Sequence, residues 1–191
     1  MEGCARDVLP DVVPVELILG RSDSTVVMLT GMRAFATGLG MSLGVRVRGR
    51  VHRRDLNGEV FDGPYTHDMD ADWQAGRLKW GFEFADGGRV TNVDPPWPPI
   101  SEHVEPASWP LGSDHVDPAW EPDRPVLIGG GGGGGDRSAN RDYWLWPLPP
   151  AGSLRVACQW LEHCIEMSIQ ELQAQPFLEA AARAQPVWPP S

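Results

Sequence analysis

Three aspartates at alternate positions, Asp68, Asp70 and Asp72, are the residues whose spacing points most directly to chemistry. Hard oxygen ligands at alternate positions suit Ca²⁺. The EF-hand calcium loop does not fit, because its glycine position would fall on Trp73 and its bidentate glutamate position on Lys79. The spacing leaves two interpretations: a solvated acidic loop, which we favour, and a metal site of another kind.

Two histidines, His103 and His115, supply a second set of potential metal ligands. They occupy equivalent places in a duplicated segment, 101–109 and 113–120, and each has carboxylates close by in the sequence. A zinc site would need ligands from both copies to converge. Because proline steps keep such a segment extended, we favour a linker-like insert over a metal site and expect no cofactor.

Arginines recur at every second position in Arg46, Arg48 and Arg50, near the end of an alternating segment at 39–52. Alternate residues of a strand face opposite sides of a sheet, so these side chains share its solvent face. One interpretation is a stripe that binds an anion or nucleic acid, and the other is an exposed strand face. The formal net charge of −10 argues against nucleic acid or an anionic membrane as a partner, so we favour the exposed face.

Nucleophilic chemistry has weak support in the sequence. His163 and Cys164 are adjacent, so their side chains point in different directions and would need a third group to act together. We interpret Cys164, like Cys158, as a core residue. The three cysteines have no paired spacing, and neither a secretory leader nor a membrane-spanning apolar run is visible, which predicts a cytoplasmic protein.

Seven consecutive glycines, residues 129–135, interrupt the elements that would position these groups. Glycine loses the most backbone entropy on ordering, so the run predicts a glycine-rich loop at 129–142 between strands at 125–128 and 143–148. A phosphate-binding loop would need Lys-Ser or Lys-Thr after the glycines, whereas Asp-Arg-Ser follows. We therefore interpret the run as a flexible, hairpin-like connection.

The segment after the glycines carries a resemblance. The run is followed by Tyr-Trp-Leu-Trp-Pro-Leu-Pro-Pro at 143–150, by a strand ending at Trp160, and by an alanine-rich helix before Val-Trp-Pro at 187–189. This order resembles an uncharacterised family of β-rich proteins from high-GC bacteria, and the likeness covers most of the chain. That family has no assigned activity, so the resemblance implies a single β-rich domain and supplies no catalytic residues.

Alternation of apolar and polar residues indicates the fold class. Residues 77–85 and 153–160 alternate, an Asp-Gly-Gly turn leads from the first of these to a partner strand at 89–93, and 176–184 has the spacing of a short helix. Short strands between glycine and proline turns predict an all-β chain: one antiparallel β-sandwich domain over 1–191, immunoglobulin-like in outline, with a short C-terminal helix. A small barrel is the alternative. The predicted core is Leu43, Val45, Val47, Trp80, Phe82, Phe84, Leu145, Leu154 and Val156.

An insert at 94–125 breaks this pattern, because it is rich in proline, tryptophan and acidic residues. Exposed tryptophan is unusual without a use, so Trp97, Trp109 and Trp120 are candidates for contacts with another protein, either a second copy or a different chain. We expect a non-catalytic binding or assembly module that acts through protein–protein contacts. A protein or enzyme that depends on Ca²⁺ or Zn²⁺, and an anion- or nucleic-acid-binding protein that uses the arginine row, are the alternatives.

Overall fold

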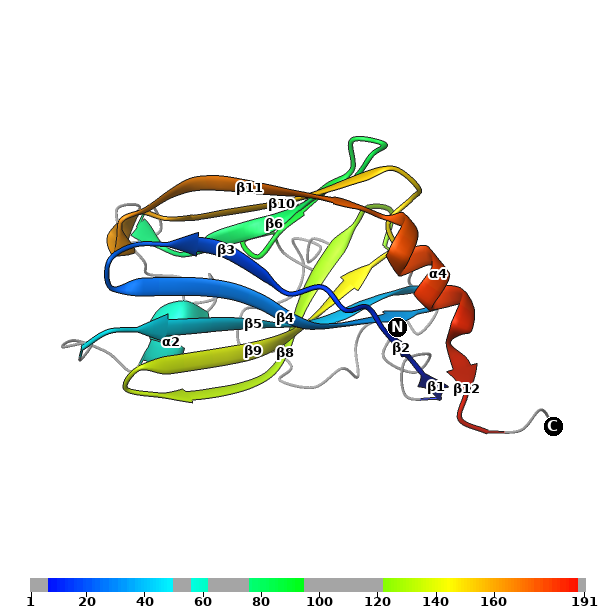
Figure 1. Cartoon of the computed structure of the whole chain (residues 1–191), viewed down its shortest axis with the longest axis horizontal. Coiled ribbons are helices and arrows are strands. Elements are labelled where there is room, and N and C mark those ends of the chain that lie inside the picture. Colours follow the sequence, from blue (N-terminus) through cyan, green and yellow to red (C-terminus); the bar gives the residue numbers. More distant parts are fainter. Residues whose placement is uncertain (1–6, 50–55, 62–75, 95–121, 189–191) are drawn as a thin grey trace, which may run out of the picture.

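The chain forms two antiparallel sheets that face each other, with a short helix across one end (Figure 1). The computed structural model describes residues 7–49, 56–61, 76–94 and 122–188. The larger sheet contains β2 (Asp11–Val12), β3 (Leu17–Arg21), β4 (Thr25–Phe35), β5 (Gly38–Val47), β8 (Val126–Gly135) and β9 (Ser138–Trp146). The smaller sheet contains β6 (Lys79–Glu83), β7 (Arg89–Thr91), β10 (Ser153–Trp160) and β11 (Ile165–Gln173). A separate ribbon pairs β1 (Val8–Leu9) with β12 (Gln185–Pro186).

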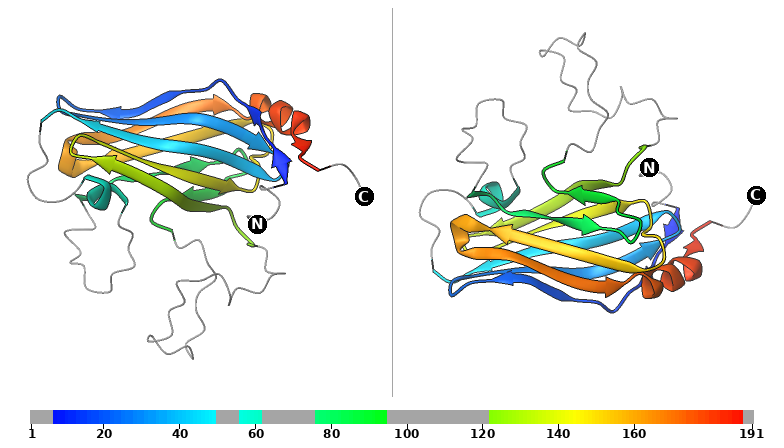
Figure 2. Two further views of the ribbon diagram at one scale, coloured as in Figure 1. Left: turned by 90° about the horizontal axis from the view of Figure 1, so that it is seen from below. Right: turned by 90° about the horizontal axis from the view of Figure 1, so that it is seen from above.

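The strand order confirms the predicted antiparallel β-sandwich. The larger sheet runs β2-β4-β5-β9-β8 with β3 also paired to β4, and the smaller runs β11-β10-β6-β7. All of these pairings are antiparallel, and Figure 2 shows the two sheets stacked as separate layers. Two facing antiparallel sheets are the outline that this fold shares with immunoglobulin domains.

One hydrophobic core lies between the inner faces of the sheets. Trp80 and Trp160 on the smaller sheet are among the largest fully buried side chains, and Leu43 and Leu145 on the larger sheet are completely buried. All predicted core residues belong to this cluster, and among them only Val47 is partly exposed. Each fully buried large apolar side chain contributes about 1.5–3 kcal/mol relative to an exposed one, so this core is the main source of stability.

Glycine turns end two of the predicted strands. In the predicted hairpin, β6 pairs with β7, and the Gly88 amide donates a 2.9 Å hydrogen bond to the Asp86 carboxylate in the turn. The hairpin is therefore confirmed. The strand predicted at 39–52 ends earlier, at Val47, because Gly49 adopts a φ of 92° that turns the chain out of the sheet.

The predicted C-terminal helix is confirmed as α4 (Gln175–Arg183). Phe177 and two alanines form its buried face, and it packs against the β2 and β4 end of the larger sheet. An ion pair of 2.5 Å joins Arg183 at its last turn to Asp11 on β2. A second helix, α2 (Leu56–Phe61), and a 3-10 turn, η3 (Leu161–His163), lie in segments for which the sequence predicted no helix.

The glycine run departs from the prediction. The loop predicted at 129–142 is wrong, because residues 129–135 continue β8 and residues 138–146 form β9, which leaves a two-residue turn. Alternate residues of β9, including Ala139 and Leu145, are fully buried, so this strand is held firmly by the core. Its backbone then offers an antiparallel partner to Gly129 and to residues 132–135, with a register shift between Gly129 and Gly132, and the resulting hydrogen bonds offset the entropy that glycine loses on ordering.

Candidate functional site

The candidate site is the outer edge of β8, which we call the glycine edge and define as residues 129–135. β8 is the last strand of the larger sheet: β9 pairs with one side of it, and no strand in the described part of the chain pairs with the other. Most of these glycines are exposed to solvent. In an antiparallel edge strand, every second residue directs both backbone polar groups away from its neighbour, so the glycine edge presents unpaired N–H and C=O groups.

Two glycines of this edge are required by close approach to β9. A Cβ atom at Gly132 would lie 2.5 Å from the backbone oxygen of Asn140, and one at Gly134 would lie 2.4 Å from that of Ser138. Both distances are shorter than real Cβ contacts, and the neighbour in each case is backbone, which cannot move aside without disturbing the ladder. Packing therefore explains glycine at these two positions.

Arg141 explains a third glycine and fixes one end of the edge. A Cβ atom at Gly129 would lie 2.8 Å from the Arg141 Nε atom. The guanidinium crosses the strand here: Nε donates a 3.0 Å hydrogen bond to the Gly130 carbonyl, and Nη1 donates a 2.9 Å bond to the Phe61 carbonyl in α2. It also lies 5.8 Å from the centroid of the Phe61 ring, within reach of a cation–π contact. Arg141 thus ties β8 and β9 to α2.

The remaining open positions are not explained by packing. A Cβ atom at Gly131, Gly133 or Gly135 would meet nothing within 4 Å, and none of these glycines has a φ in the left-handed region. Alanine or a larger residue would therefore fit the folded chain at all three places. Glycine here has another consequence: it leaves the strand without side chains along its unpaired side.

In the described chain, the edges of β3, β7 and β11 are covered, short or charged, whereas the glycine edge carries a bulge and no charge. β3 is closed off by β11, where the Ser168 hydroxyl donates a hydrogen bond to the Leu19 carbonyl. β7 is only three residues long and carries Arg89, and β11 carries exposed Glu166 and Glu171. Charged side chains and short length are the usual means by which proteins prevent strand addition. The ten residues of β8 include neither a charge nor a proline, but a register shift between Gly129 and Gly132 places a bulge in its pairing with β9.

Elsewhere in the same sheet, aromatic rings cover glycines on a neighbouring strand. On the outer face, Trp144 of β9 lies against Gly38 of β5, with ring carbon Cζ2 2.7 Å from a Cβ position there. Phe35 of β4 approaches Gly40 of β5 from the opposite side, at 3.3 Å. The two rings meet edge to face with centroids 5.0 Å apart. Gly38 and Gly40 are thus covered by rings from both flanking strands, which is a known way to stabilise glycine in a sheet, whereas Gly44 of the same strand lies near the Met28 and Arg46 side chains instead.

The structure describes two residues of the arginine row. Arg46 and Arg48 are exposed, as predicted, and Arg50 lies outside the described residues. The Arg46 guanidinium folds back onto its own sheet, where Nη1 donates to the Val45 carbonyl at 2.8 Å and to the Asn140 side chain at 3.4 Å. This geometry fits a solvated strand face.

The predicted metal ligands and insert tryptophans lie outside the described residues. These are Asp68, Asp70, Asp72, His103, His115, Trp97, Trp109 and Trp120. Within the residues that the structure describes, no group of three or more His, Cys, Asp or Glu side chains gathers closely enough to hold a metal ion. Nor is any helix in that part of the chain long and apolar enough to cross a membrane.

His163 and Cys164 lie in the turn between β10 and β11, at one end of the smaller sheet. The His163 ring stacks on Trp160, with centroids 3.8 Å apart, and its Nδ1 atom shares a 2.8 Å hydrogen bond with the hydroxyl of buried Thr25. Cys164 is exposed, so its interpretation as a core residue is wrong; it ends η3 with a φ of 54°. Cys158 is buried as predicted, and burial raises the pKa of its thiol to about 12.

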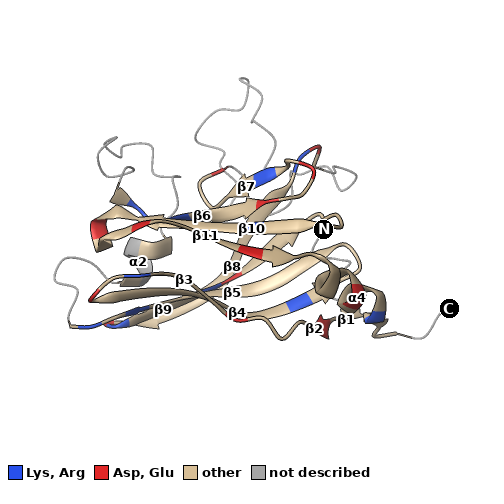
Figure 3. Ribbon diagram, turned by 45° about the horizontal axis from the view of Figure 1, so that its top comes forward, with Lys and Arg blue, Asp and Glu red and all other residues tan. Residues whose placement is uncertain are grey.

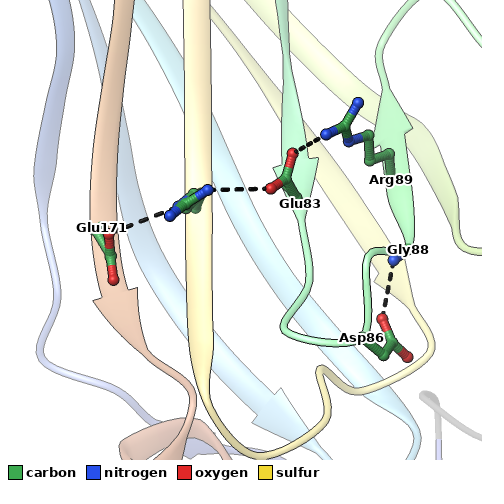
Figure 4. A network of polar contacts seen from close by, with 6 residues as sticks. Glu83, Asp86, Gly88, Arg89 and Glu171 are labelled. Carbon is green, nitrogen blue, oxygen red and sulfur yellow. Dashed lines mark hydrogen bonds and ion pairs between the residues drawn. The ribbon is translucent and has the colours of Figure 1, made fainter.

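The outer face of the smaller sheet carries paired charges and, on β11, the exposed apolar side chains of Met167 and Ile169. Figure 3 shows charged residues across it, and Figure 4 shows how they pair. Glu83 on β6 bonds Arg89 on β7 at 2.7 Å and Arg155 on β10 at 3.2 Å, and Arg155 lies 3.6 Å from Glu171 on β11. Such exposed pairs each contribute at most about 1 kcal/mol. Opposite charges therefore already neutralise one another on this face.

Comparison with known proteins gives no relative: no family model, no curated protein and no solved structure matches this chain. The sequence did not reveal the glycine edge, because the glycine content of residues 129–135 predicted a loop, whereas pairing with β9 makes them part of a strand. The signal that could have found it is the alternation along Ser138–Trp146, which predicts a strand longer than 143–148 and so a partner of equal length.

Proposed function

We propose that this protein is a non-catalytic binding or assembly module that holds another protein by adding a strand of that protein to the glycine edge. The observation that carries the proposal is the open, uncharged edge of β8, whereas the edges of β3, β7 and β11 in the described chain are covered, short or charged. Main-chain hydrogen bonds give strand addition its affinity, and an edge without side chains leaves those groups accessible.

The test adds charge at two of the three glycines where a Cβ atom meets no neighbour. A Cβ atom at Gly131 or Gly133 meets nothing within 4 Å, and lysine there places on the edge a residue that proteins often use to block strand addition. The matched control adds the same charge at exposed Gln173 and Ala182, on β11 and α4. Tagged full-length protein and both variants are used to recover partners from a lysate of the source cells.

Wild type and control are expected to recover the same partner, and the Gly131→Lys/Gly133→Lys variant is expected to lose it. A third variant lacks residues 94–123, which contain the insert tryptophans. Loss of the partner from this deletion alone would assign the contact to the insert instead of the edge. Equal recovery by the wild type and the edge variant would refute strand addition at β8.

A further inference from the structure

We infer that two copies of this protein associate through the outer faces of their smaller sheets. The inference goes beyond the proposed function and does not depend on it, because the glycine edge belongs to the larger sheet. The face consists of the outer sides of β11, β10, β6 and β7, and no described element lies over it in the right-hand view of Figure 2. Its side chains form rows across the four strands, and the order of residues within two rows identifies the partner.

The first row is bulky and apolar at one end only. Its members, in strand order from β11 to β7, are Ile169, Ala157, Gly81 and Thr91. Ile169 is 60 % exposed, and Met167, on the same side of β11, is 58 % exposed. The rest of the row is small, and Gly81 has to stay small because a Cβ atom there would collide with the backbone of β7. The face is therefore raised at β11 and flat toward β6 and β7.

The second row alternates in charge. Its members, in the same strand order, are Glu171, Arg155, Glu83 and Arg89. Neighbouring members form the ion pairs drawn in Figure 4, so all four side chains point to the same side of the sheet. From β11 to β7 the signs are negative, positive, negative and positive. Reversal of this order exchanges every sign, so each charge would meet its opposite on a second copy in which the row runs the other way.

A two-fold axis parallel to the strands, between β10 and β6, produces this reversal. It places β11 of one copy over β7 of the other, and β10 over β6, in a closed and self-complementary contact. Glu171 then faces Arg89 of the second copy, and Arg155 faces its Glu83. An axis across the strands, along the charged row, would place each charge over the same charge of the other copy, which electrostatic repulsion opposes.

The same axis brings the bulky end of the apolar row over the small end. Ile169 would lie over Thr91 of the second copy and beside its Gly81, so a large side chain packs onto small residues. Stacked sheets interdigitate in this way, and they keep their strand directions within about 30° of each other, which lets the rows of two copies align. Apolar packing and charge therefore favour the same arrangement.

The size of the face predicts a weak dimer. Four strands spaced about 4.8 Å apart and the eight residues of β10 at about 3.3 Å each give roughly 500 Å² per copy, or about 1,000 Å² in total. Stable interfaces bury about 1,200–2,000 Å². The charged row adds orientation more than affinity, because its members lose water when they are covered. We therefore expect two copies to associate reversibly at micromolar concentrations.

Sedimentation equilibrium of the full-length protein measures this association. The wild type is expected to shift from monomer to dimer as its concentration rises through the micromolar range. Ile169→Lys places a charge at the centre of the apolar contact and should weaken the dimer at least about tenfold. The matched control, Val12→Lys, makes a similar change at a side chain on β2 that is 62 % exposed, and it should leave the dimer unchanged.

Two charge reversals test the two-fold arrangement itself. Arg155→Glu and Glu83→Arg each place like charges opposite each other in a dimer of one variant, so each variant alone should associate more weakly than the wild type. An equimolar mixture should recover the dimer, because every altered residue then faces a residue of opposite charge. The ion pairs lost within each chain are exposed and contribute at most about 1 kcal/mol, and circular dichroism checks that both variants are folded.

Other results would overturn the inference in distinct ways. A wild type that stays monomeric, or a dimer that Ile169→Lys leaves intact, would refute it, and a mixture of reversals that stays monomeric would refute the two-fold arrangement. Loss of the dimer with Val12→Lys alone would move the contact to the end formed by β1, β2 and β12, where Leu9 and Trp188 are also exposed. Loss with Gly131→Lys/Gly133→Lys would move it to the glycine edge. Partner recovery decides the proposed function separately in each case.

Discussion

Alanine substitutions along the glycine edge should have opposite effects at adjacent residues. At Gly134, the new Cβ atom must retreat from 2.4 Å to about 3.0 Å from the Ser138 oxygen, a displacement of about 0.6 Å against backbone. A ladder bond of about 2.9 Å would then reach about 3.5 Å, beyond a good hydrogen bond. Gly133 has open space, so alanine there introduces no such strain.

The strain and a weakened ladder bond together predict a loss of about 2 kcal/mol for Gly134→Ala. In a chain of this size each kcal/mol lowers the melting temperature by about 2–4 °C, so the expected decrease is about 4–8 °C. Gly133→Ala should raise stability by up to about 1 kcal/mol, because alanine restricts the unfolded chain more than glycine does.

Thermal unfolding followed by circular dichroism measures both variants, with urea midpoints as a second measure of the free energy of unfolding. Gly132→Ala and Gly131→Ala form an independent pair with the same contrast, since a Cβ atom at Gly132 lies 2.5 Å from backbone and one at Gly131 meets nothing. If all four variants melt within a degree or so of one another, the glycines are not paired with β9 and our reasoning is refuted.

Three further predictions concern the core and the outer face. In the native protein at pH 8, iodoacetamide should label exposed Cys164 but not buried Cys158. Burial raises the pKa of the Cys158 thiol from 9.0 to about 12, so the stability that the neutral thiol contributes is full below pH 9 and is lost as pH rises toward 12. Cys158→Ala should flatten that loss, measured as urea midpoints across this pH range. Thr25→Val removes the hydroxyl bonded to His163 and should cost about 1–3 kcal/mol in urea unfolding, whereas Thr25→Ser should restore most of it. Trp144→Ala uncovers a glycine of β5 and should cost about 2 kcal/mol, whereas equal stability of Trp144→Ala and wild type would show that the ring contributes nothing there.

Much of the fold could be predicted because side-chain alternation reports burial directly. In β6 and β10 the inward residues are large and apolar, including Trp80, Phe82 and Val156, and they form the core between the sheets. Helix α4 could be predicted equally well, since Phe177 and its neighbouring alanines repeat at helical spacing. These patterns depend on local sequence, so they can be recognised without knowing the contacts made by the rest of the chain.

The glycine edge could not be predicted in the same way, because glycine carries no side-chain pattern. Its conformation is imposed from outside by β9, through close approach at Gly132 and Gly134 and through the Arg141 guanidinium across Gly129. Cys164 shows the same limit, because its exposure follows from a backbone turn with a φ of 54° and not from its apolar character. In both cases tertiary context outweighs the intrinsic preference of the residue.

Amide hydrogen exchange of protein labelled with ¹⁵N-glycine tests the free edge of β8 most directly. In the free protein, amides along residues 132–135 should alternate between slow exchange, where β9 accepts the hydrogen bond, and fast exchange, where the N–H faces outward. Fast exchange at all of these amides would contradict a paired strand, and slow exchange at all of them in the free protein would contradict an open edge.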